Sequence, residues 1–105
     1  MNAIQQPEIR IEATTIGRAS VANVLSPEEV SDATMRRLRA EIIDKFGTVK
    51  KFAPLLSSIG YEGLNDNLAG RSEMRLNVLY ECLAVIEMDQ VEFARRVMTD
   101  AERAR

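Results

Sequence analysis

The sequence contains no histidine, no tryptophan and a single cysteine, Cys82. One cysteine cannot form a disulfide within the chain, and without histidine a metal site would have to be built from carboxylates alone. The carboxylates show no suitable clustering, so no metal site is expected. We also expect no enzyme activity, because no nucleophile stands beside a visible base. Cys82 lies on an apolar helical face and is expected to be a buried thiol.

Aromatic residues and long apolar runs are also scarce. Aromatic residues make up 5% of the chain, which predicts a largely aliphatic core. No apolar run approaches the roughly 18 residues that suggest a membrane span, and the N-terminus lacks a basic region followed by an apolar stretch. These absences predict a soluble protein of a reducing compartment, the cytoplasm, with no bound cofactor.

The chain has 105 residues, which suits one domain, and a net charge of −2. The charge is uneven, because residues 31–75 hold eight basic and six acidic residues, whereas residues 76–94 hold acidic residues and no basic one. An acidic protein has no general electrostatic attraction for nucleic acid. DNA binding would therefore need a local basic surface, and the acidic C-terminal helices could instead bind a protein.

The pattern of apolar residues divides the chain into an arm, a domain and a tail. Residues 1–25 show no helical period and are expected to form a flexible arm, with a strand added to a partner as the alternative. Residues 26–98 carry apolar residues three or four positions apart, which predicts an all-α domain of about five short helices. Residues 99–105 are expected to be a frayed tail.

Capping residues and glycines mark the expected helix boundaries. Ser26 and Pro27 suit the start of the first helix, and Gly47 suits its end. Thr48 should cap a second helix, which Pro54 should shorten or kink because an interior proline removes a hydrogen-bond donor. The later helices are expected at residues 61–69, 75–88 and 91–98.

Two short helices joined by a tight turn form a helix-turn-helix. Over residues 34–94 the apolar positions resemble the lambda-repressor/Cro (XRE) family. Ala53 in "TVKKFAPLL" matches a buried alanine of the second helix, and Ile59 matches the apolar residue after the turn. Leu64 follows five residues later, and Gly70 in "NLAGR" closes the third helix. The apolar pattern that follows in the family is matched by Leu76, Leu79, Cys82, Leu83, Ile86, Met88 and Phe93.

The resemblance implies a sequence-specific transcriptional regulator of bacterial or phage type, a repressor that occupies operator sites in double-stranded DNA. The third helix, in "YEGLNDNLAG", would enter the major groove. The polar side chains expected to contact DNA could alternatively be ordinary solvent-exposed residues on the helix surfaces. The expected base contacts are Tyr61, Glu62, Asn65 and, at the margin, Asp66, and the expected phosphate contacts are Lys50, Lys51, Arg71 and Arg75.

Two positions in the third helix leave the geometry open. Asn67 stands where the family has a buried apolar residue, and Leu68 is expected to take that place. Gly63 would lower helix stability. It would be required either by close approach of the backbone to DNA or by a clash between a side chain and the second helix.

The fifth helix carries more apolar residues than a small core can cover, which predicts a homodimer. Two-fold dimers are the commonest assembly and match palindromic operators. Phe93 is expected to face inward, leaving Val97 and Met98 as the dimer interface. The alternative function is a protein-interaction module, an antitoxin or adaptor on the same helical fold.

Overall fold

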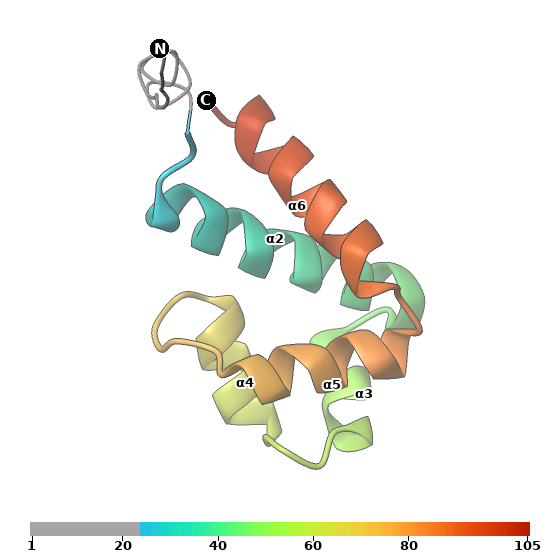
Figure 1. Ribbon diagram of the computed structural model, residues 1–105. Coiled ribbons are helices and arrows are strands. Elements are labelled where there is room, and N and C mark those ends of the chain that lie inside the picture. Colours follow the sequence, from blue (N-terminus) through green and yellow to red (C-terminus); the bar gives the residue numbers. More distant parts are fainter. Residues whose placement is uncertain (1–23) are drawn as a thin grey trace, which may run out of the picture.

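The computed structural model describes residues 24–105 and is all-helical over that range. This result confirms the predicted all-α class. The arm expected at residues 1–25 lies outside the described residues, apart from Val24 and Leu25. Five α-helices and one 3₁₀ turn follow along the described chain (Figure 1): α2 (Pro27–Phe46), α3 (Val49–Phe52), η2 (Ala53–Leu55), α4 (Tyr61–Leu68), α5 (Leu76–Ile86) and α6 (Gln90–Arg103).

Helix α2 begins and ends where its capping residues predict. The hydroxyl of Ser26 accepts a hydrogen bond from the backbone N–H of Glu29 at 3.1 Å, and the Glu29 carboxylate accepts from the Ser26 N–H at 2.7 Å. This reciprocal pair is a capping box, and Pro27 occupies the first turn. Gly47 closes the helix with a positive φ of 87°, a conformation that glycine adopts without steric cost.

The second helix is short, as Pro54 predicts. Thr48 caps α3 by accepting a hydrogen bond from the Lys51 N–H at 3.1 Å. The α-helical hydrogen bonding lasts for four residues and then tightens into the 3₁₀ turn η2, in which Pro54 lies near the start. A proline near the start of a helical segment is tolerated because no N–H is needed there.

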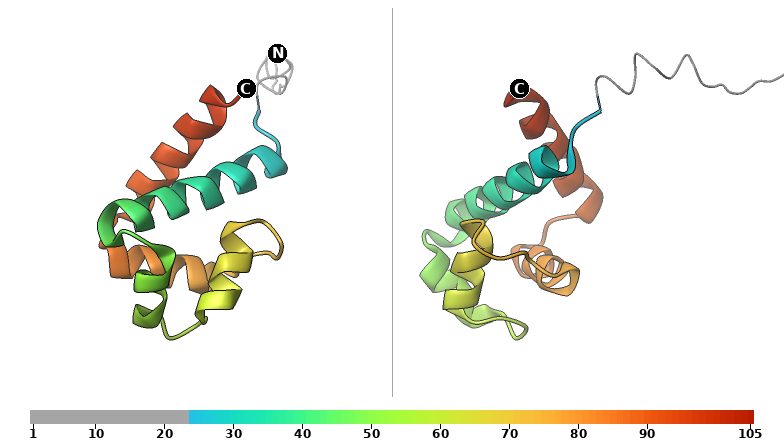
Figure 2. Two further views of the ribbon diagram at one scale, coloured as in Figure 1. Left: turned by 180° about the vertical axis from the view of Figure 1, so that it is seen from behind. Right: turned by 90° about the vertical axis from the view of Figure 1, so that its left-hand side faces the viewer.

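Helix α2 lies in the middle of the fold, with α6 on one side and α3, α4 and α5 on the other (Figures 1 and 2). Its residues Ala33, Leu38 and Ile42 are fully buried. The core is mainly aliphatic, with Phe52 and Phe93 as its buried aromatic side chains. Its other buried apolar members are Val49, Ala53, Leu56, Leu64, Leu68, Val78, Cys82, Leu83, Ile86, Val97 and Ala101. No helix within residues 24–105 is long and apolar enough to cross a membrane.

The C-terminal residues correct the prediction of a frayed tail. Helix α6 continues to Arg103, and Ala101 is buried against the core. Tertiary contacts extend the helix, because Asp100 binds Arg37 of α2 in addition to the packing of Ala101. The apolar spacing of residues 93, 97 and 101 was the signal in the sequence for this extra turn.

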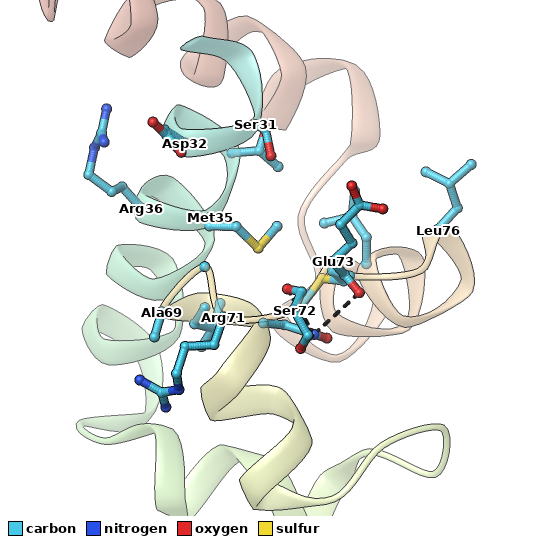
Figure 3. A pocket seen from close by; sticks show the side chains of 15 residues that line it. Ser31, Asp32, Met35, Arg36, Ala69, Arg71, Ser72, Glu73 and Leu76 are labelled. Carbon is cyan, nitrogen blue, oxygen red and sulfur yellow. Dashed lines mark hydrogen bonds between the residues drawn. The ribbon is translucent and has the colours of Figure 1, made fainter. Parts of the chain in front are cut away.

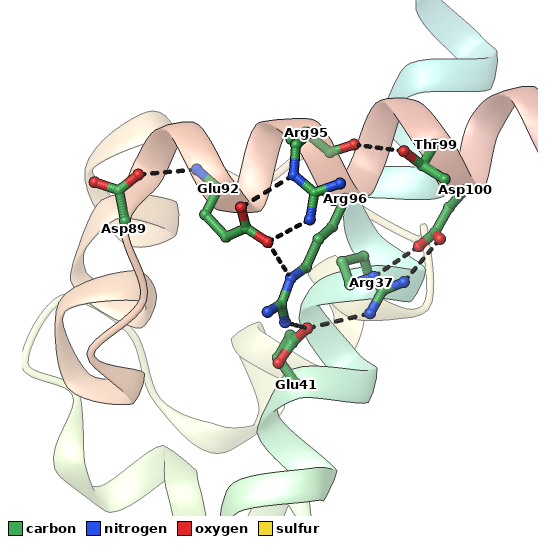
Figure 4. A network of polar contacts seen from close by, with 8 residues as sticks. All are labelled: Arg37, Glu41, Asp89, Glu92, Arg95, Arg96, Thr99 and Asp100. Atoms are coloured by element: carbon green, nitrogen blue, oxygen red, sulfur yellow. Dashed lines mark hydrogen bonds and ion pairs between the residues drawn. The ribbon is translucent and has the colours of Figure 1, made fainter.

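An ion-pair network joins α6 to α2 (Figure 4). The Arg37 guanidinium donates two hydrogen bonds of 2.7 Å to the Asp100 carboxylate. Glu41 bridges the two helices, because its Oε2 accepts from Arg37 at 3.2 Å and from Arg96 at 2.8 Å. Arg37 lowers the pKa of Asp100, mainly by hydrogen bonding. The network therefore fixes the rotation of α6 about its axis, which apolar packing alone specifies less well.

We expect Arg37 and Asp100 to stabilise the fold as a pair. In a double-mutant cycle with Arg37→Ala and Asp100→Ala, the coupling should be about 1 kcal/mol, because the pair is bidentate and only partly exposed. Urea unfolding of the four proteins measures it. Arg39→Ala, an exposed change on the same helix, serves as the control. If the two substitutions lowered the free energy of unfolding in a strictly additive way, the pairing would be contradicted.

Candidate nucleic-acid interface

The segment from α3 to α4 consists of short helical pieces joined by a non-helical turn. Helix α3 and the turn η2 cover residues 49–55, a non-helical turn follows at 56–60, and α4 covers Tyr61–Leu68. Both helices pack against α2 and against each other. Leu64 and Leu68 of α4 point into the core, so the opposite face of α4 is exposed.

The structure brings three of the predicted base-contacting residues together on the outer face of α4. Tyr61, Glu62 and Asn65 are spaced so that they share one side of the helix. Tyr61 and Glu62 are exposed, and Asn65 is partly exposed. Gly60 at the start of α4 provides no capping side chain, so the first N–H groups of α4 receive no side-chain cap. This end of α4 combines free backbone donors with amide and carboxylate side chains.

Asp66 and Arg71 differ from the other predicted contacts because they bind each other. The Arg71 guanidinium lies 2.9 Å from Asp66 Oδ1, and the Arg71 backbone N–H donates to the Asp66 carbonyl oxygen at 2.9 Å. The pair closes the C-terminal end of α4 and is exposed to solvent, where ion pairs contribute little stability. Asp66 therefore belongs to the exit of α4 rather than to its exposed start.

The remaining predicted phosphate contacts flank α4. Lys50 and Lys51 are exposed in the first turn of α3, and Arg75 is exposed at the residue that precedes α5. Their side chains form no ion pair within residues 24–105. Three cations without acidic partners thus lie before and after the helix whose outer face is polar.

Gly63 is explained by packing against the turn. A Cβ atom at this position would lie 2.9 Å from Cγ1 of Ile59, which is closer than carbon atoms tolerate. The neighbour that a side chain would meet is therefore this turn residue, so of the two alternatives for Gly63 the clash with the second helix is not found. Glycine at 63 lets Ile59 pack beneath α4.

Asn67 is buried, and so is Leu68, which was expected to replace it. The Asn67 amide donates to the hydroxyl of Ser72 at 2.8 Å, to the Ser72 carbonyl at 3.3 Å and to the Glu73 carbonyl at 3.4 Å. It thereby holds the connection between α4 and α5, which carries Arg71 and Arg75. A groove of about 620 Å³ lies between this connection and α2, with Met35 and Ser72 on its walls (Figure 3).

The turn before α4 is held by Glu81 of α5, a contact that sequence reasoning missed. Ser57 and Ser58 donate their backbone N–H groups and their hydroxyls to the two carboxylate oxygens, at 2.5–2.9 Å. Hydrogen bonds to the charged form lower the pKa of Glu81 to about 2. Two adjacent serines in a turn and a glutamate on a following helix were the available sequence signal, but their pairing depends on how α5 packs.

Cys82, the neighbour of Glu81 in sequence, is fully buried. Burial and then the Glu81 charge raise the pKa of its thiol to about 12, so it stays protonated at neutral pH. This confirms the interpretation as a buried thiol. Within residues 24–105, no group of three or more histidine, cysteine, aspartate or glutamate side chains could hold a metal ion.

No protein-family model, curated protein or solved structure matches this chain. Its function is therefore inferred from the residues and their arrangement.

The Glu81 carboxylate should titrate near pH 2 in the folded protein. A lowered pKa means that Glu81 contributes its stabilisation fully above pH 4.5, the ordinary value, and loses it as the pH falls towards 2. An NMR titration of the Glu81 carboxyl carbon and the Ser57 and Ser58 amides measures this. The urea-unfolded chain is the control. A folded-state midpoint near 4.5 would show that the hydrogen bonds are absent in solution.

Proposed function

We propose that this chain is a sequence-specific regulator of transcription that binds double-stranded DNA through α3 and α4. The observation that carries the proposal is the outward polar face of α4, with Tyr61, Glu62 and Asn65 on one side of a short helix that follows a tight turn. In this role α4 is the recognition helix and lies in the major groove.

The side chains on this face suit contacts to base edges. Asn65 can bind adenine through two hydrogen bonds, and Glu62 can accept a hydrogen bond from the amino group of cytosine. Tyr61 can contact a thymine methyl group or a phosphate. Acidic side chains repel the DNA backbone, so binding requires cations nearby.

Lys50, Lys51 and Arg75 supply those cations. Phosphate contacts provide affinity and register, while base contacts choose the sequence. Arg71 can join them if it exchanges Asp66 for a phosphate, and the exposure of that pair keeps the cost of exchange small. Regulation would then be repression by occupation of an operator in the cytoplasm of a bacterium.

The division between base and phosphate contacts predicts different effects of substitution. Asn65→Ala should weaken binding to an operator selected from random DNA by ~1–3 kcal/mol and leave non-specific binding nearly unchanged. Lys50→Ala with Lys51→Ala should weaken both kinds of binding and lower the salt slope by roughly one for each phosphate that the variant no longer neutralises.

Fluorescence anisotropy over a series of salt concentrations measures both effects, and melting temperatures verify that the variants are folded. Arg103→Ala, an exposed change on α6, is the control for loss of positive charge. If folded variants bind the selected site as tightly as the original chain, α4 is not a recognition helix.

A homodimer is part of the proposal, with a corrected interface. Val97 is only 3% exposed and belongs to the core of the single chain, so it was wrongly expected at the interface. Met98 is 43% exposed, and Val91 on the same face of α6 is 76% exposed. We place the two-fold contact on this outer face of α6, where a second copy would cover both side chains.

Met98→Glu should therefore shift the chain to the monomer, because it places a charge at the centre of the contact. Sedimentation velocity at micromolar concentration, with and without operator DNA, measures the change. Val24→Glu adds the same charge at an exposed apolar residue outside α6 and should leave the dimer intact. A single monomeric species for the original chain under both conditions would reject the dimer.

A protein-interaction module is the second candidate, and one observation favours it. The outer face of α5 carries Leu76, 67% exposed, and Tyr80, 46% exposed. Glu81 is the one charged residue of α5, and the turn serines engage it. An uncharged outer face on a small domain is a common mark of a protein contact.

The acidic surface expected from the charge distribution supports this second candidate less well. Glu92 and Asp100 of α6 are paired with arginines of α2 and α6, so much of the acidity is neutralised within the fold. A gel-shift assay with genomic fragments at low and moderate salt distinguishes the candidates. Specific complexes support the regulator, and their absence favours the interaction module.

A further inference from the structure

The turn that leads into α4 is bound to α5 by one carboxylate. Glu81 Oε2 accepts from the N–H of Ser57 at 2.7 Å and from its hydroxyl at 2.8 Å. Glu81 Oε1 accepts from the N–H of Ser58 at 2.9 Å and from its hydroxyl at 2.5 Å. Each oxygen thus binds a different residue of the turn, and the carboxylate satisfies the hydrogen bonding of both backbone N–H groups.

This contact restrains orientation as well as distance. One hydrogen bond lets a turn rotate about the donor–acceptor line, whereas two carboxylate oxygens bound to successive residues remove that rotation. Hydrogen bonds to a charged acceptor are also shorter and stronger than neutral ones. Ser58 stands three residues before Tyr61, so a shift of the turn is transmitted directly to the start of α4.

The start of α4 has few other restraints. It lacks a capping side chain, and an isolated helix of eight residues is unstable in water. Leu64 and Leu68 bury its inner face, and Asn67 fixes its exit to the α4–α5 connection. Apart from the packing of Leu56 and Ile59, the contact with Glu81 is the main restraint on the turn that leads into α4.

We infer that Glu81 is a positioning residue, which fixes the turn at Ser57 and Ser58 to α5 and so sets the orientation of α4. The inference has a structural part, the orientation of α4 in the free protein, and a functional part, the DNA affinity, which rests on the proposed function. A bidentate contact such as that of Asn65 with adenine needs correct placement of the side chain, so a turn that rotates freely should lower affinity for the selected site more than non-specific affinity.

The structural part is tested without DNA. Glu81→Gln keeps the size of the side chain but replaces one acceptor oxygen by an N–H₂ donor. Amide exchange at Ser57 and Ser58 should become at least about ten times faster, and residual dipolar couplings of the α4 amides should no longer fit the orientation of the original chain. Glu87→Gln, an exposed change just after α5, is the matched control and should change neither.

A second variant keeps the test decisive if Glu81→Gln does not fold. Ser57→Ala with Ser58→Ala removes the hydroxyl donors but keeps both backbone donors. Its effects on amide exchange and on the dipolar couplings of α4 should therefore have the same direction as those of Glu81→Gln and be smaller. If the dipolar couplings of α4 in both folded variants match the original chain, Glu81 does not position α4 and the inference is overturned.

The functional part is measured on DNA selected from random sequence. Glu81→Gln should lower affinity for that site about tenfold and change affinity for unrelated DNA by less than twofold. Equal loss on both, or no loss, overturns the role in recognition. If the original chain binds no DNA, the proposed function fails, while the dipolar couplings still decide whether Glu81 orients α4.

Discussion

Burial of α2 on two sides is the constraint on which the rest of the structure depends. Leu38 and Ile42 are fully buried, and α3, α4, α5 and α6 all pack on this one helix. A small domain buries little surface per residue, so a central helix is an efficient way to share a core. Lys45 near its end also donates to the Ile86 carbonyl, which ties the last turn of α5 to α2.

The candidate recognition surface depends on α2 only indirectly, because α4 is short and its outer face is polar. Leu64 and Leu68 on its inner face pack into the core, but this packing alone permits small rotations of α4. Asn67 at the exit and Glu81 at the entry restrict those rotations through hydrogen bonds. Polar contacts are well suited to this task, since their energy falls steeply with distance and angle.

The distribution of charge follows from the same packing. The acidic composition of the chain suggested an acidic surface, but the fold pairs Glu41 and Asp100 with arginines across the contact between α2 and α6. Glu92 is paired with arginines of α6 itself. Among the described residues 24–105, Lys50 and Lys51 beside α4 are left without acidic partners. Composition therefore described the average charge well and the local charge near the candidate DNA interface poorly.

The sequence by itself determined the all-α class, the caps at Ser26 and Thr48, the short second helix at Pro54 and the burial of Cys82. These features depend on residues a few positions apart, whose spacing is visible in the chain. Tertiary structure alone decided the pairing of Arg37 with Asp100 and the contacts of Glu81 with the turn. The partners in those contacts are far apart in sequence: Arg37 and Asp100 are separated by 63 positions, and Ser57 and Glu81 by 24. Such pairs form only when packed helices bring them together, so no local spacing announces them.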